Sequence, residues 1–130
     1  MLIEVTPSPI LPGAAISAVH SDACGVVISY VGTVRNVSQD GRRVRFMELQ
    51  AAKADLARRE LTRIAREIAD RWQLEGVALV QRVGRLEVGE VLLVVAVGAP
   101  HRKEALEACQ YAVDRFKEVS PAWITETLED

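Results

Sequence analysis

The sequence lacks most features that mark membrane, secreted and metal-binding proteins. Its longest apolar run, residues 91–97, is too short to cross a bilayer, and its start has no cationic segment of the kind that begins a secretory signal. The two cysteines, Cys24 and Cys109, stand singly and not at the spacing of metal ligands. These absences favour a cytoplasmic protein without a metal, in which both cysteines are small buried hydrophobic residues.

Neither sign of charge is in excess, because 16 lysines and arginines face 18 aspartates and glutamates and leave a formal net charge of −2. This balance argues against nucleic acid or a membrane surface as a partner, since both attract a cationic excess. It still allows a local basic pocket for a small anion. The sequence also has no P-loop, dinucleotide-binding, serine hydrolase or zinc protease motif.

What is present predicts one α+β domain over residues 1–130, with a mixed or antiparallel sheet covered by helices. The proline-rich start is expected to be an extended lead-in, and residues 84–89 a connection. Hydrophobic periodicity predicts helices at 14–20, 52–72 and 101–119 and strands at 25–35, 43–49, 77–83, 90–98 and 123–128. The strand at 90–98 is apolar without alternation, so we expect it to be buried on both faces.

The clearest local anomaly is a cluster of cations at the start of the last helix, Pro100-His101-Arg102-Lys103. The N-terminus of a helix carries partial positive charge, which makes added cations unfavourable there. A bound anion would reverse this, because free backbone N–H groups and the Arg102 guanidinium would both face it. The pattern therefore predicts a phosphate or carboxylate site at His101 and Arg102; the alternative is a set of exposed, hydrated side chains.

Other charged residues carry weaker signals. Lys117 lies beside the apolar stripe of the last helix, where partial burial would let it act as an acid, base or nucleophile. Arg35 ends a strand, a place that often contacts ligands, and Arg82 lies in an apolar strand and needs water or an anionic partner. Each of these can also be an ordinary exposed charge. Glu87 and Glu90 flank a turn and are expected to cap backbone groups.

Seven short segments, taken in order, resemble the large, catalytic subunit of molybdopterin synthase over roughly residues 13–126. The segments are Gly32-Thr33-Val34-Arg35, Arg71-Trp72, Arg82-Val83-Gly84, Val88-Gly89-Glu90, His101-Arg102, Asp114-Arg115-Phe116-Lys117 and Pro121-Ala122-Trp123. The resemblance implies an α/β hammerhead-type fold and a homodimer. It also implies a small ubiquitin-like partner subunit at each end of that dimer.

The resemblance further implies a sulfurtransferase without a resident cofactor. In that family, the partner's thiocarboxylated C-terminus gives its sulfur to cyclic pyranopterin monophosphate, and two transfers build molybdopterin. Carried over by position, Lys117 is the catalytic lysine, which polarises the thiocarboxylate carbonyl or moves protons. Arg35, His101 and Arg102 bind the anionic substrate.

The sequence departs from the family pattern at several positions. Ile124 stands where a second functional lysine usually follows the tryptophan, so Lys103 or Arg115 is expected to compensate near the substrate. Gln81 replaces a histidine, and the chain ends at Asp130, before the expected tail. An isoleucine cannot donate a hydrogen bond, and losing one such donor costs about two to three powers of ten in rate.

Three readings of the function follow. The first is a working sulfurtransferase that relies on Lys117. The second is a catalytically impaired homologue that acts as a dimeric pterin-binding, anion-binding or scaffold protein. The third is a regulatory small-ligand module of the α+β class.

Overall fold

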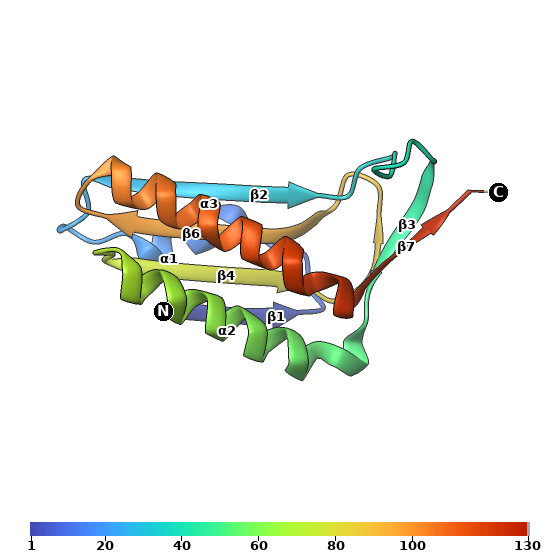
Figure 1. Cartoon of the computed structure of the whole chain (residues 1–130), viewed down its shortest axis with the longest axis horizontal. Coiled ribbons are helices and arrows are strands. Elements are labelled where there is room, and N and C mark those ends of the chain that lie inside the picture. Colours follow the sequence, from blue (N-terminus) through green and yellow to red (C-terminus); the bar gives the residue numbers. More distant parts are fainter. Residues whose placement is uncertain (130) are drawn as a thin grey trace.

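A four-stranded mixed sheet forms the centre of the protein (Figure 1). The computed structural model describes residues 1–129. Across the sheet lie β1 (Leu2–Thr6), β4 (Gly76–Arg82), β6 (Val91–Ala99) and β2 (Val26–Thr33), in that order. β1 runs parallel to β4, and the other neighbours are antiparallel. The predicted α+β class with a mixed sheet is confirmed.

Helices cover both faces of this sheet. The two long helices, α2 (Ala54–Arg71) and α3 (Arg102–Val119), lie side by side on one face, and the short α1 (Pro12–Val19) lies on the other (Figure 1). β6 supplies side chains to both cores, with Val95 facing the long helices and Val94 facing α1. The expectation that this strand is buried on both faces is confirmed.

Close packing of α1 depends on a glycine in the central strand β6. A Cβ atom at Gly98 would lie 2.5 Å from the Val19 carbonyl oxygen and 2.9 Å from the Cys24 sulfur. Only a residue without a side chain therefore lets the end of α1 rest on the sheet.

A second, three-stranded sheet extends from one end of the molecule (Figure 1). Its order is β5 (Gly84–Glu87), β3 (Val44–Leu49) and β7 (Ile124–Leu128), with antiparallel pairing throughout. The 3-10 turn η2 (Ser120–Ala122) joins α3 to β7, and η1 (Ala51–Lys53) precedes α2. A small core of Val34, Val44, Leu49 and Leu86 lies beneath this sheet.

Two strands were missed by the sequence analysis. β1 lies in the segment expected to be an extended lead-in, because the three prolines that follow residue 6 are typical of extended, unpaired chain. β5 lies in the expected connection 84–89; it is four residues long, and Gly84 at its start and Gly89, two residues after its end, have positive φ angles of 102° and 92°. Both strands are short and lie next to prolines or glycines, which favour turns and loops in a sequence-based prediction.

The two cysteines differ in burial. Cys109, on the buried face of α3, is 6% exposed, as expected. Its burial raises the pKa of its thiol to about 11. Cys24 is only half-buried, so its expected burial is wrong. It lies in the loop before β2, where its sulfur donates to the Val19 carbonyl at 3.6 Å.

Over residues 1–129, no helix combines the length and apolarity needed to cross a membrane.

Candidate active site

A cavity of about 780 Å³ lies where the two sheets and the end of α3 meet. Its walls come from the end of β2, the loop between β2 and β3, the last turn of α3, and β7. The lining residues are Tyr30, Val31, Gly32, Thr33, Arg35, Ser38, Gln39, Asp40, Met47, Leu92, Leu93, Phe116, Lys117, Ser120, Ile124, Glu126 and Leu128.

Arg35 and Lys117 are the cations that line this cavity. Arg35 follows β2 directly, and Lys117 projects from the last turn of α3, where the helix C-terminus favours a positive charge. Both side chains belong to exposed residues, and in the described part of the chain neither has a carboxylate within ion-pair distance. The fold thus brings together two predicted site residues and leaves both able to bind an anion.

Two carboxylates that the sequence analysis did not single out also line the cavity, Asp40 and Glu126. The Ser38 hydroxyl donates to Asp40 and accepts from the Arg42 backbone N–H at 3.2 Å. The hydrogen bond from Ser38 lowers the pKa of the Asp40 carboxyl, and the backbone N–H and positive charge of Arg42 lower it further. Glu126 lies two residues after Ile124 on β7. Side chains two residues apart in a strand lie on the same face, so the position of Ile124 could have indicated that of Glu126. No group of three potential metal ligands occurs among residues 1–129.

Ile124, which stands where the resemblance implies a lysine, does lie in the cavity. Met47, Leu92 and Phe116 are further apolar residues of the lining. Among the described residues, Lys117 therefore supplies the one ammonium group of this cavity.

His101, Arg102 and Lys103 lie at the other end of α3 and do not line the cavity. All three are exposed, and His101 occupies the N-cap position without a side-chain capping bond. A helix of 18 residues is about 27 Å long, so the two ends cannot share one small ligand within a single chain. The predicted cationic cluster is thus split into two groups.

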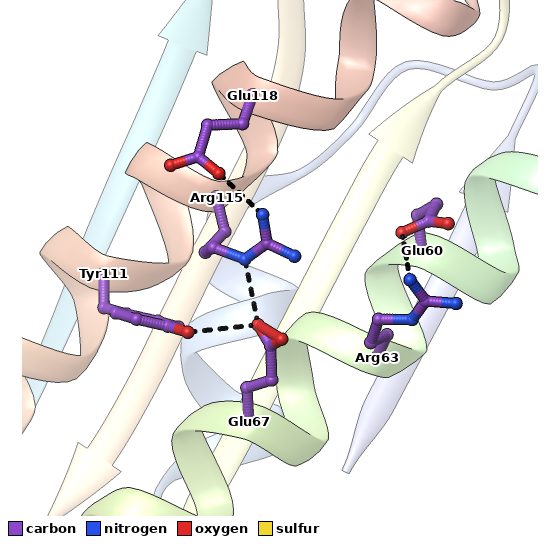
Figure 2. A network of polar contacts seen from close by, with 6 residues as sticks. All are labelled: Glu60, Arg63, Glu67, Tyr111, Arg115 and Glu118. Carbon is purple, nitrogen blue, oxygen red and sulfur yellow. Dashed lines mark hydrogen bonds and ion pairs between the residues drawn. The ribbon is translucent and has the colours of Figure 1, made fainter.

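Arg115 also lies outside the cavity, because it points toward α2 (Figure 2). Its Nε donates to Glu67 at 3.0 Å and its Nη1 donates to Glu118 at 2.6 Å, while the Tyr111 hydroxyl donates to Glu67 at 3.3 Å. The bond to Glu67, followed by that to Glu118, raises the pKa of Arg115 above its ordinary value. Within one chain, neither Arg115 nor Lys103 is thus placed to replace the missing lysine.

The pair Arg82 and Glu90 has a structural role. Arg82 donates to the Pro7 carbonyl at 3.0 Å and to Glu90 at 3.3 Å, which confirms the expected anionic partner. Glu90 also accepts the Glu87 backbone N–H at 2.7 Å; this bond, with Arg82, lowers the pKa of Glu90. The expected capping of the turn is confirmed for Glu90.

Behind the cavity wall lies a buried pair that sequence reasoning did not predict. The Trp123 indole N–H donates to the Gln81 side-chain oxygen at 3.1 Å, and the Trp123 ring packs edge-on against Phe116 at 6.2 Å. The two elements that carry Lys117 and Ile124 are thus joined behind the site.

Comparison with known proteins gives a consistent family. Residues 5–119 match the family described as MoaE protein. The molybdopterin synthase catalytic subunit of Halalkalibacterium halodurans is 36% identical over 126 residues, covering 97% of this chain and 80% of the relative. That of Bacillus subtilis is 37% identical over 127 residues, covering 98% and 80%.

Solved structures show the same fold. A crystal structure of molybdopterin synthase from Staphylococcus aureus superposes with a TM-score of 0.86 at 29% identity, covering 98% of this chain and 92% of that one. A complex of subunits 1 and 2 of molybdopterin-converting factor from Helicobacter pylori gives 0.70 at 18% identity, covering 97% and 84%. The second comparison supports the fold alone.

Proposed function

Because the chain belongs to the MoaE protein family, whose relatives above are molybdopterin synthase catalytic subunits, we propose that it transfers sulfur to cyclic pyranopterin monophosphate. The sulfur comes from the thiocarboxylated C-terminus of a small partner subunit. No resident cofactor is required, since the sulfur donor and the pterin are both substrates. The observation that carries the proposal is the cavity in which Arg35 and Lys117 meet.

The chemistry suits these two cations. In each transfer the thiocarboxylate sulfur attacks a side-chain carbon of the pterin, so that a C–S bond forms and a C–O bond breaks. Water then cleaves the acyl–sulfur bond and returns the partner's terminus as a carboxylate. Lys117 stabilises the negative charge that develops on oxygen or supplies the proton that oxygen takes up, and Arg35 binds the substrate phosphate.

We further propose a homodimer in which β2 lies antiparallel to β2 of the second copy. β2 is an edge strand of the central sheet, and Val31 on it is 42% exposed. Its first end lies beside the start of α3, where the Gly25 N–H donates to the Ala99 carbonyl at 3.0 Å, and its other end lines the cavity. An antiparallel arrangement would bring His101 and Arg102 of the second copy to the cavity that holds Lys117.

Ile124 makes a slow enzyme the expectation. An apolar side chain at this place cannot stabilise charge in the transition state. Turnover therefore depends on Lys117, the one lysine among the described residues that line the cavity. A catalytically impaired binding protein is the limit of this effect.

The test combines the purified chain with thiocarboxylated small subunit and cyclic pyranopterin monophosphate and measures molybdopterin. The wild type should form product, Lys117→Ala should reduce the rate by about a thousandfold, and Arg66→Ala, an exposed cation on α2, should leave it unchanged. If the wild type binds the small subunit tightly and forms no product, the chain is a binding protein and the proposal fails.

A further inference from the structure

A buried polar pair connects the central sheet to the cavity. Gln81 on β4 has no exposed surface, and Trp123 is 1% exposed. The indole N–H has one hydrogen to donate, and the Gln81 oxygen accepts it at 3.1 Å. The other polar atom of the same amide, Nε2, is buried and has no hydrogen-bond partner among residues 1–129.

This arrangement is costly for stability. A buried amide NH₂ group without a partner loses its bonds to water and gains none in return. An apolar side chain of similar volume at position 81 would remove that penalty, but it would leave the buried indole N–H of Trp123 without an acceptor, so the two costs largely offset each other. Glutamine therefore brings no clear gain in stability, and its presence is better explained by the indole that its oxygen holds.

Trp123 is held at the junction of the two elements that form the reactive wall. Its ring packs at 73° against Phe116, the residue before Lys117, and its own chain continues into Ile124. Its carbonyl accepts the Gln50 backbone N–H at 3.0 Å. Rotation of the indole would therefore move both Phe116 and Ile124, which line the cavity.

We propose that Gln81 is a positioning residue for sulfur transfer, acting through Trp123 on the placement of Lys117 and Ile124. This inference rests on the proposed function. What position 81 must supply is a hydrogen-bond acceptor for the indole N–H. A histidine ring nitrogen can also accept this bond, and histidine is the residue that the family resemblance implies here.

The test compares three variants at position 81 with Gln110→Met, the same change at an exposed site on α3. Gln81→Met nearly conserves volume and exchanges one buried unpaired donor, the amide NH₂, for another, the Trp123 indole N–H, so the urea unfolding midpoint should stay close to that of the wild type. Its kcat should fall about tenfold or more, because small displacements of catalytic groups are costly, with KM for either substrate unchanged. Gln81→His should restore most of the kcat, and Gln110→Met should behave as the wild type.

Two readouts act independently of turnover. The indole N–H resonance of Trp123 and the δ-methyl resonance of Ile124 should shift in Gln81→Met and return toward their wild-type positions in Gln81→His. Gln81→Asn shortens the side chain and withdraws the acceptor while keeping the amide, so it should lower kcat as Gln81→Met does. This variant decides the matter if Gln81→Met folds poorly.

The outcomes separate the two proposals. An active wild type with an unchanged kcat in Gln81→Met or Gln81→Asn overturns the positioning role alone. A loss in Gln81→His as large as that in Gln81→Met also overturns it, because acceptance of the bond would then not be what matters. An inactive wild type refutes the proposed function. The Ile124 δ-methyl resonance then tests the positioning role by itself: if it is the same in Gln81→Met as in the wild type, the positioning role is refuted as well.

Discussion

At the scale of single residues, the cavity holds one lysine where the family resemblance implies two. Ile124 and Lys117 both line the cavity, so an ammonium group introduced at position 124 would enter the same space. The three lysines of the chain are Lys53, Lys103 and Lys117, and only the last lines the cavity. The charge missing at position 124 is therefore not supplied by another lysine of the same chain.

Ile124→Lys should raise the rate of molybdopterin formation by about 10- to 100-fold, because a second donor would stabilise charge in the transition state. Ile124→Met is the matched control, since methionine, like lysine, is unbranched and of similar length but carries no charge. Single-turnover assays with saturating small subunit measure the effect. Equal rates for the two variants would show that position 124 takes no part in the chemistry.

The thiol of Cys109 offers a test of core burial. Its pKa of about 11 leaves only about one thiol in a thousand ionised at pH 8, and the thiolate is the reactive form. Iodoacetamide at this pH should therefore modify Cys24, which is half-buried, and spare Cys109. Mass spectrometry of the intact protein should show one added group per chain, with a second appearing as the pH approaches 11 or on addition of urea.

At the scale of elements, α2 and α3 are joined by the polar network of Figure 2. Arg115 and Glu67 connect the two helices with side chains 22% and 30% exposed, whereas Arg63 belongs to α2 alone, is 65% exposed and lies 3.7 Å from Glu60. Partial burial reduces screening by water, so the ion pair of Arg115 with Glu67 should contribute more to the free energy of unfolding than that of Arg63 with Glu60.

Arg115→Met should lower the free energy of unfolding by about 1 kcal/mol, because it removes two charge-assisted hydrogen bonds at a half-buried site. Arg63→Met should change it by less than about 0.5 kcal/mol. Urea unfolding followed by circular dichroism measures both. A loss of activity in Arg115→Met at unchanged stability would contradict its placement outside the cavity and return it to the substrate site.

The elements that the sequence predicted well are the long ones. The two amphipathic helices and the apolar β6 carry periodic or continuous patterns over many residues, and their observed bounds differ from the expected ones by at most two residues. β1 and β5 have only five and four residues, and each exists because a partner strand lies beside it. Pairing between distant segments is a tertiary effect that a local pattern does not contain.

At the scale of the whole molecule, the predicted site residues other than Arg115 form two groups at opposite ends of α3. The residue types were predicted from the helix terminus and the resemblance, but their separation was not, because residue spacing along a helix gives a distance without saying which cavity each end meets. Asp40 and Glu126 were missed for a related reason, since they reach the cavity from a loop and an edge strand that only the assembled fold brings together.

Mixing two inactive variants tests whether the proposed dimer unites these groups. In a dimer of Lys117→Ala with Arg102→Ala, one cavity would lack both side chains and the other would keep both. With random exchange of subunits, half of the dimers are mixed, so activity should return to about one quarter of the wild-type value. Activity is measured before and after exchange. No recovery, with exchange confirmed by mass spectrometry, would place the whole site within one chain.

The position of Lys117 near the end of the 18-residue helix α3 limits insertions and deletions within that helix. Inserting or deleting one residue upstream in α3 would turn everything after it by about 100° and shift it by about 1.5 Å. Lys117 would then leave the cavity, and Phe116 would lose its place against Trp123. Exposed positions of α3 can therefore vary in residue type, while the number of residues between its two ends is fixed.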